Sequence, residues 1–143
     1  MIKDKLLIGI DPDADKSGIA VKCDLFTKLS NLTFFELFDL LSSYKETREN
    51  IEVYIECGFL NKGNWHKTNG SNSVNAQIGQ RTGANHEVAK KIVEMCKYLG
   101  IMCYEIKPTR SKVNSDFFKQ ITKIEKRTNQ EQRDAYMLIY GKK

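Results

Sequence analysis

The stretch Leu6-Leu7-Ile8-Gly9-Ile10-Asp11-Pro12 is the part of the sequence that decides the fold. Its apolar, β-rich run predicts a buried strand, which Asp11 ends. Residues 12–18 have the composition of a turn, and Ile19-Ala20-Val21 resumes as a second strand. The two strands are therefore predicted to form a hairpin, with a carboxylate at the end of its first strand.

The rest of the chain alternates between strand and helix patterns. Further strands are predicted over 28–32, 51–56 and 101–106, and helices over 33–41, 74–99, 115–126 and 130–140. Residues 58–73 are rich in Gly, Asn, Lys and Ser and are predicted to form a loop. The order indicates an α/β fold with a mixed five-stranded sheet, its first three strands antiparallel, flanked by helices. We expect residues 1–143 to form one domain.

Composition narrows the class of protein. The chain has 143 residues, 41% of them hydrophobic, and only two prolines, which is typical of a globular domain. Its N-terminal apolar run is too short for a membrane span and has no signal-peptide cleavage region, so we expect a cytoplasmic protein without a membrane partner. The four cysteines form no C-x-x-C pair, which argues against a zinc site and a disulfide framework.

The positive charge is concentrated near the C-terminus. From Lys107 onward the chain has ten Lys and Arg against four Asp and Glu, whereas residues 1–106 have thirteen against fourteen. A solvated helix surface and a nucleic-acid-binding surface both account for this excess. The acidic residues are needed to decide between them.

Four carboxylates are placed where a fold of this kind could gather them. Asp11 and Glu56 each end a predicted strand, and Glu131 and Asp134 lie three residues apart near the start of the last helix. Taken singly, each has a simpler explanation, as a turn former, a solvated strand end or a residue that favours the helix dipole. Together they would repel one another unless cations lay between them, and oxygen ligands suit Mg²⁺ or Mn²⁺.

Five motifs, in order along the chain, resemble those of the RuvC family of Holliday-junction resolvases. Leu7-Ile8-Gly9-Ile10-Asp11-Pro12 with Ser17-Gly18-Ile19-Ala20-Val21 resembles the family's opening hairpin, G-I-D-P-G and G-[YI]-[GA]-V. Ile55-Glu56-Cys57-Gly58-Phe59 resembles its second motif, and Ile78-Gly79-Gln80-Arg81-Thr82-Gly83 the L-G-Q-x-x-G that opens its long helix. Tyr104-Glu105-Ile106-Lys107-Pro108 with Lys112 is similar to Y-x-P-x-x-x-K, and Glu131-Gln132-Arg133-Asp134-Ala135 to the closing [D/H]-x-x-D-A.

The resemblance implies an RNase H-like fold and a nuclease that uses two Mg²⁺ or Mn²⁺ ions. It implies that Asp11, Glu56, Glu131 and Asp134 are the catalytic, metal-binding set. Two positions depart from the family pattern. Asp13 replaces a Gly and adds a carboxylate near the metal ligands, and Glu131 stands where Asp or His is usual. The segment before the last motif is shorter than in typical bacterial members, which points to a phage-type form in a bacterium or an infected cell.

Basic and aromatic residues around these motifs are the candidate DNA-binding residues. They are Phe59, Lys62, Trp65, Lys67, Gln80, Arg81, Lys107, Arg110, Lys112 and Lys119. Lys112 matches the family's basic position and is the first choice for a phosphate contact. Ordinary core packing is the alternative for Phe59. Gly79 and Gly83 permit close packing, either against the chain's own sheet or in a homodimer through the helix that starts near Ile78.

The expected function is therefore a metal-dependent endonuclease for branched DNA, foremost four-way junctions, in recombination and repair. The nearest alternative keeps the fold and acts on flaps, forks or RNA–DNA hybrids. A DNA-binding protein with an inactive site is a second alternative. A fragment of an actin- or sugar-kinase-type ATPase is a third, although the chain is short and has no second Gly-rich phosphate loop. Junction preference, choice of metal and any helicase partner are not encoded in recognisable motifs.

Overall fold

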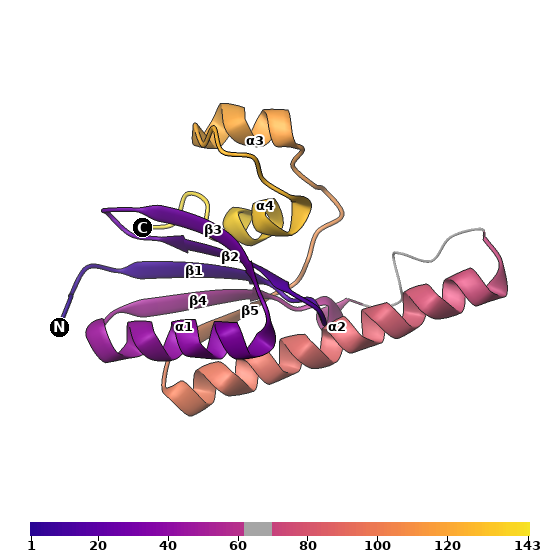
Figure 1. Ribbon diagram of the computed structural model, residues 1–143, viewed down its shortest axis with the longest axis horizontal. Coiled ribbons are helices and arrows are strands. Elements are labelled where there is room, and N and C mark those ends of the chain that lie inside the picture. Colours follow the sequence, from indigo (N-terminus) through magenta and orange to yellow (C-terminus); the bar gives the residue numbers. More distant parts are fainter. Residues whose placement is uncertain (62–69) are drawn as a thin grey trace.

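The computed structural model describes residues 1–61 and 70–143. Its centre is a five-stranded sheet in the order β3-β2-β1-β4-β5 (Figure 1). The strands are β1 (Leu6–Asp11), β2 (Ser17–Lys22), β3 (Thr27–Leu32), β4 (Ile51–Glu56) and β5 (Met102–Ile106). β1 pairs antiparallel with β2 and β2 with β3, while β1 with β4 and β4 with β5 are parallel. The mixed sheet predicted from the sequence is confirmed, including its antiparallel first three strands.

β1 is the central strand because it is apolar on both faces. Every residue from Leu6 to Ile10 is buried, and only Asp11 at its end is partly exposed. β4 instead alternates: Ile51, Val53 and Ile55 point into one core, and the residues between them are partly exposed. β1 and β4 are parallel neighbours and end side by side, β1 on Asp11 and β4 on Glu56.

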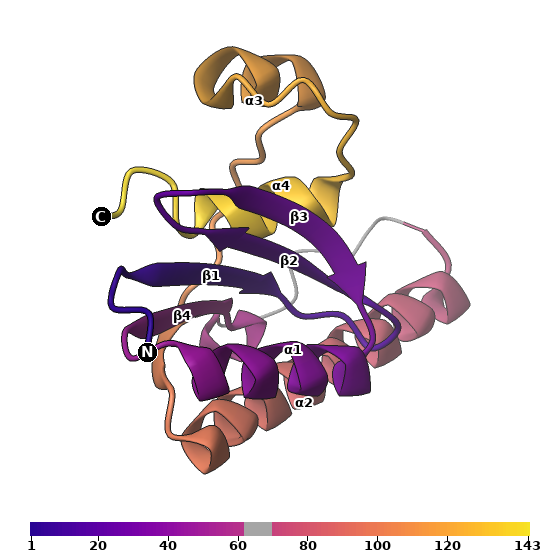
Figure 2. The ribbon, with the colours of Figure 1, turned by 60° about the vertical axis from the view of Figure 1, so that its left-hand side comes forward.

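One face of the sheet is covered by two helices, α1 (Phe34–Thr47) and α2 (Asn72–Leu99) (Figure 2). Thr33 and Glu36 form a capping box that starts α1, as the sequence predicts. Gly100 adopts a left-handed conformation, with φ 70°, and closes α2. Leu37 and Ile92, which are fully buried, belong to the larger of two core clusters under these helices.

The other face is covered by α4 (Gln130–Met137), while α3 (Ser115–Thr122) lies above α4, away from the sheet (Figure 1). Phe118 of α3 and Ile139 are fully buried in the second core cluster. Both helices are shorter than predicted. Lys123 takes a left-handed conformation, with φ 62°, which ends α3 before the expected limit of residue 126. α4 likewise ends at Met137 rather than near residue 140.

Two glycines allow α4 to lie directly on the hairpin. A Cβ atom at Gly9 would collide with the backbone carbonyl of Ala135, and one at Gly18 with the backbone carbonyl of Glu131. α4 therefore packs backbone against backbone on β1 and β2. This close approach sets how far Glu131 and Asp134 of α4 lie from the ends of the strands.

The first half of α2 extends well beyond the sheet (Figure 1). A Cβ atom at Gly79 or at Gly83 would have no atom within 4 Å apart from the helix itself and its immediate neighbours. Packing against the chain's own sheet therefore does not explain these two glycines within the described residues. The helix surface around Gly79 and Gly83 is therefore not covered by the described part of the chain.

No helix among residues 1–61 and 70–143 is long and apolar enough to cross a membrane. All four cysteines are free thiols, and two of them, Cys57 and Cys96, are buried in the larger core.

The glycine contacts generate a stability prediction. Gly9→Ala should lower the free energy of unfolding by about 2 kcal/mol, because the new methyl group forces α4 away from β1. The matched substitution Gly79→Ala, at an open helical position, should raise it by up to about 1 kcal/mol in dilute protein. Urea unfolding measures both values. Equal effects of the two substitutions would contradict the close packing of α4.

Candidate active site

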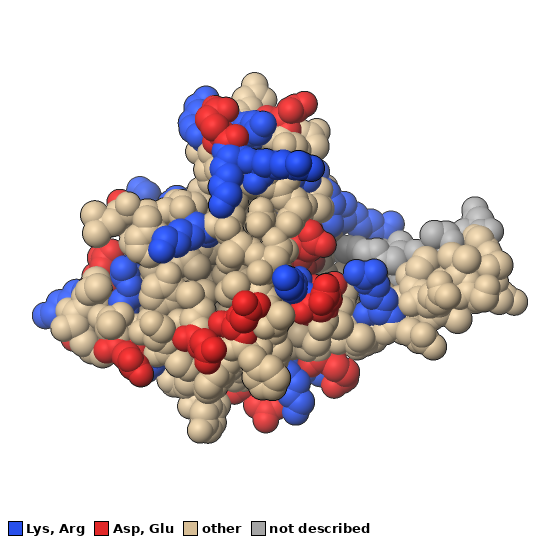
Figure 3. Space-filling model, in the orientation of Figure 1, with Lys and Arg blue, Asp and Glu red and all other residues tan. Residues whose placement is uncertain are grey.

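A cleft of about 760 Å³ opens where β1 and β4 end. The first half of α2 forms one wall, and the segment after β5 together with the start of α4 forms the other. Acidic residues lie at its base, and cations from both walls lie beside them. The polar and charged residues that line it include Asp11, Asp13, Glu56, Arg81, Asn85, His86, Arg110, Lys112, Gln130, Glu131 and Asp134. Figure 3 shows acidic and basic side chains side by side on one face of the molecule.

Three separate elements bring the carboxylates together. Ile10 and Ile55 are paired neighbours on β1 and β4, so the next residues, Asp11 and Glu56, emerge at the same edge. α4 crosses the hairpin above that edge and supplies Asp134, with Glu131 one turn earlier. The structure therefore gathers all four sequence-predicted carboxylates around one cleft.

Burial and mutual repulsion disturb the ionisation of two of these groups. Burial raises the pKa of Asp11 to about 8, and the nearby Glu56, Asp134 and Glu131 add to the rise while Lys112 opposes it. Burial also raises the pKa of Glu56, with Lys112 opposing and Asp134 adding to the shift. The site therefore lacks positive charge for the number of carboxylates that it holds.

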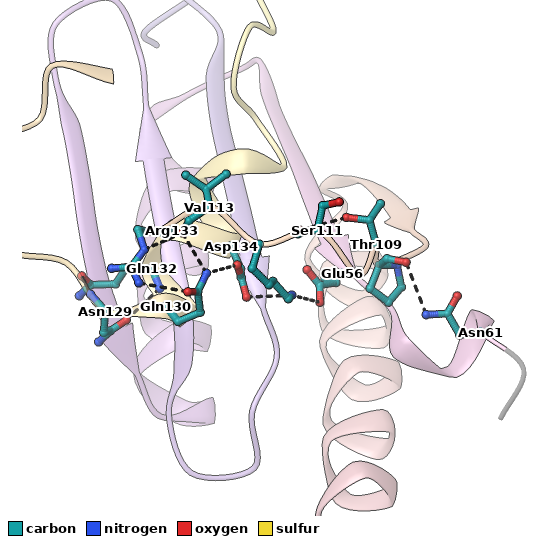
Figure 4. Close-up of polar contacts among 12 residues, drawn as sticks. Glu56, Asn61, Thr109, Ser111, Val113, Asn129, Gln130, Gln132, Arg133 and Asp134 are labelled. Carbon is teal, nitrogen blue, oxygen red and sulfur yellow. Dashed lines mark hydrogen bonds and ion pairs between the residues drawn. The ribbon is translucent and has the colours of Figure 1, made fainter. Parts of the chain in front are cut away.

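Lys112 supplies the positive charge that the site does have. Its Nζ donates to Oδ2 of Asp134 at 3.0 Å and lies 3.8 Å from Oε1 of Glu56. Burial by itself lowers the pKa of Lys112, but Glu56, Asp134 and Asp11 together raise it above its ordinary value. The ammonium thus joins β4 to α4 across the cleft, beside the two carboxylates that Figure 4 shows facing each other.

A hydrogen-bond network fixes Asp134 and the segment that carries Lys112 (Figure 4). Gln130 donates to Oδ1 of Asp134 at 2.7 Å and to the carbonyl of Val113 at 3.3 Å. Arg133 donates from Nε to the same carbonyl at 3.0 Å, and from its other nitrogens to Thr128 and Gln130. Gln130 is not among the site residues predicted from the sequence, although its spacing of four from Asp134 on a helix indicates such a contact.

The donor chemistry of the cleft fits a divalent metal. Its ligands would be carboxylate oxygens, which suit Mg²⁺ and Mn²⁺. A cation beside Asp11 would favour the charged form of this carboxyl, whose pKa burial raises. As arranged here, no group of three or more His, Cys, Asp or Glu side chains in the described part of the chain could hold a metal ion. Lys112 lies between Glu56 and Asp134 instead.

Asp13 lines the same cleft as the other carboxylates, and its side chain contacts the β1–β2 turn and α2. Its Oδ2 accepts from the backbone of Asp15 at 2.9 Å, and its Oδ1 accepts from Asn85 at 3.3 Å and lies 3.9 Å from Arg81. Asn85 in turn accepts from the backbone of Ala14 at 2.8 Å. Asp13 therefore fastens the β1–β2 turn to α2 and holds one wall of the cleft.

The predicted DNA-binding residues divide into four groups. Arg81, Arg110 and Lys112 line the cleft, whereas Gln80, Lys107 and Lys119 do not. Lys62, Trp65 and Lys67 lie outside the described residues. Phe59 is partly buried against the larger core.

Two side chains of α2 cover the Phe59 ring, which follows β4 in a 3₁₀ turn (Gly58–Leu60). His86 meets the ring edge-on, with centroids 6.5 Å apart, and Lys90 lies 5.5 Å from its centre. Phe59 thus packs against α2, as the core-packing alternative predicted. His86 also lines the cleft, close to Gly58, and no local pattern in the sequence pointed to it.

Comparison with known proteins identifies the fold. No protein-family model matches the sequence, and no curated protein matches it either. The structure is similar to that of T. thermophilus RuvC in complex with a Holliday-junction substrate, with a TM-score of 0.52 and 13% sequence identity over 94% of this chain and 89% of that one. A second structure of *Thermus thermophilus* RuvC gives a TM-score of 0.50 and 12% identity over 93% and 90% of the two chains.

This chain has the RuvC fold. The RNase H-like architecture implied by the sequence motifs is thereby confirmed. Because the similarity extends over almost the whole of both chains, the RuvC fold accounts for the sheet and the helices together rather than for a shared hairpin alone.

The raised pKa of Asp11 predicts how stability depends on pH. In the unfolded chain this pKa is about 4, and in the folded protein it is about 8. The folded state therefore binds the extra proton between these values, and in EDTA the free energy of unfolding should fall as pH rises from about 4 to about 8. Asp11→Asn should reduce this slope and be more stable than the unsubstituted protein at pH 8. Mg²⁺ should stabilise the unsubstituted protein more than the variant.

Urea unfolding between pH 5 and pH 8 measures this difference. Asp39→Asn, the same chemical change at an exposed position of α1, is the control and should keep the original slope. A slope that Asp11→Asn leaves unchanged would show that Asp11 ionises normally.

Proposed function

We propose that this chain is a divalent-metal-dependent endonuclease that cuts branched DNA, with the four-way junction as its principal substrate. The observation that carries the proposal is the convergence of Asp11, Glu56 and Asp134 at one edge of a RuvC-like sheet. The structural neighbour was solved in complex with a Holliday-junction substrate, which supports the choice of branched DNA.

The residues of the cleft divide between metal and phosphate. Asp11, Glu56 and Asp134, with Glu131 beside them, would hold one or two Mg²⁺ or Mn²⁺ ions. When bound, such ions supply an activated water and stabilise the leaving oxygen of a phosphodiester. Gln130 orients Asp134 by donating a hydrogen bond to its Oδ1. Oδ2 then faces the ammonium of Lys112 in the cleft.

The cations on the two walls would bind the DNA backbone. Arg110 and Lys112 belong to the wall formed by the segment after β5, and Arg81 to the wall formed by α2. A strand lying between them would meet phosphate-binding groups on both sides and carboxylates below. This arrangement provides affinity without base contacts, which suits an enzyme that selects its substrate by structure.

We also propose that two copies associate through the first half of α2. Residues 72–80 have no charged side chain, extend beyond the sheet and include Gly79 in open surroundings. Val74 is 44% exposed on this part of the helix. A two-fold axis through this surface would place two active sites for paired incisions across a junction.

The dimer is tested by light scattering at micromolar concentration, with and without junction DNA. The unsubstituted protein should have twice the mass of one chain, and Gly79→Leu should be monomeric because its side chain would separate the helices. Gln77→Ala, a milder change on the same exposed segment, is the control for folding and solubility. A single-chain mass in the presence of junction would exclude this interface.

The nuclease proposal is tested with labelled four-way junction, flap, fork, duplex and RNA–DNA hybrid, in Mg²⁺, Mn²⁺ and EDTA. Cleavage should require metal and favour the junction. If the protein prefers a flap, fork or hybrid, metal-dependent cleavage stands and the proposed substrate is wrong. Cutting in EDTA would refute the metal-dependent nuclease itself.

Replacing each carboxylate of the cleft by its amide tests whether that residue is needed for cleavage. Asp11→Asn, Glu56→Gln and Asp134→Asn should each lower cleavage by at least about a hundredfold, while junction binding in EDTA stays equal or becomes tighter because a negative charge is removed. Glu131→Gln should lose less activity, and Asp39→Asn on α1 none. Paired cleavage and gel-shift assays at fixed salt measure both properties. If Asp11→Asn cuts at the original rate, the assignment of the carboxylates is wrong.

A further inference from the structure

Lys112 is the one described cation in contact with two of the candidate metal ligands. Its ammonium lies 3.0 Å from Asp134 and 3.8 Å from Glu56. The side chains of Asp134 and Glu56 are only 11% and 17% exposed, whereas that of Lys112 is 41% exposed. The carboxylates are held in the base of the cleft, and the ammonium is the partner that has room to leave.

The backbone beside Lys112 is anchored independently of its ammonium. Arg133 and Gln130 both donate to the carbonyl of Val113, the next residue along the chain. The lysine stem is flexible, with four methylene groups between this anchored backbone and the charge. The ammonium can therefore exchange its carboxylate partners for others at the mouth of the cleft without unfolding the wall.

A divalent metal and Lys112 need the same oxygen atoms. A metal bound by Asp134 and Glu56 would lie within contact distance of the ammonium, and like charges at that distance repel strongly in a partly buried site. A DNA phosphate in the cleft is negatively charged, as the carboxylates are. The ammonium can therefore bind the phosphate in their place.

We propose that Lys112 is an internal counter-ion that competes with the metal for Glu56 and Asp134, and that a DNA phosphate relieves this competition by binding the ammonium. The proposal rests on the proposed nuclease function and adds to it a coupling between substrate and metal. Because such a coupling is reciprocal, DNA raises the affinity of the site for metal and metal raises its affinity for DNA. The protein without DNA then holds its metal weakly.

The first test measures Mn²⁺ binding to the whole protein without DNA, by calorimetry. Lys112→Met should bind Mn²⁺ about tenfold more tightly than the unsubstituted protein, within the usual range of coupling between two sites. Lys112→Arg, which keeps the charge, should not gain affinity. Lys126→Met removes the same charge from an exposed position outside the cleft and should bind like the unsubstituted protein.

The outcomes separate this proposal from the function on which it rests. If Lys112→Met binds Mn²⁺ no more tightly than the unsubstituted protein, the competition is refuted while the metal site stands. If Asp134→Asn binds Mn²⁺ as well as the unsubstituted protein, or if none of the proteins binds it, the metal site itself is refuted, and the competition with it.

A second measurement follows the ammonium in the unsubstituted protein, so that it does not depend on the folding of Lys112→Met. Nitrogen-15 NMR of the lysine ammonium groups, with Lys112 assigned through Lys112→Arg, should show its signal move on addition of Mg²⁺. Junction DNA added in EDTA should move the same signal, while that of Lys126 responds to neither Mg²⁺ nor DNA. A Lys112 signal that Mg²⁺ or junction leaves unchanged would refute the corresponding half of the proposal.

Discussion

The ion pair of Lys112 with Asp134 and Glu56 is the interaction on which the functional half of the structure depends. Partly buried carboxylates from β1, β4 and α4 repel one another unless positive charge or a bound proton lies among them. The ammonium lies 3.0 Å from Asp134 and 3.8 Å from Glu56, while burial, with Glu56 and Asp134 adding to it, raises the pKa of Asp11 to about 8. A divalent metal, as proposed for this site, would bring more positive charge to these carboxylates than the lysine does.

Packing elsewhere in the chain serves that arrangement. α4 can deliver Asp134 to the edge of the sheet only because Gly9 and Gly18 let its backbone rest on the hairpin. On the other side, Asp13 and Asn85 fasten the β1–β2 turn to α2, which fixes the opposite wall. Among residues 1–61 and 70–143, the cleft is therefore bounded by contacts that are themselves part of the fold.

Much of the fold and of the acidic set follows from local patterns. The apolar run that Asp11 ends, the alternation from Ile51 to Glu56 and the Thr33–Glu36 capping box each indicate one element, and each element is present. Helix ends were less accessible, because Lys123 ends α3 through a left-handed conformation that its residue type does not favour. The role of Asp13 was also beyond reach, since its partner Asn85 is 72 residues away.

The sequence by itself determined the strand order of the hairpin, the α/β class and the identity of the four carboxylates, because these depend on periodicity and on motifs read over a few residues. Tertiary structure alone decided what surrounds those carboxylates. Gln130 donates to Asp134, His86 lines the cleft close to Gly58, Phe59 packs against α2, and Lys112 lies between Glu56 and Asp134. Each of these contacts depends on where α2, α4 and the segment after β5 meet the sheet. These segments are far apart in the sequence, so their contacts are set by packing rather than by any local pattern.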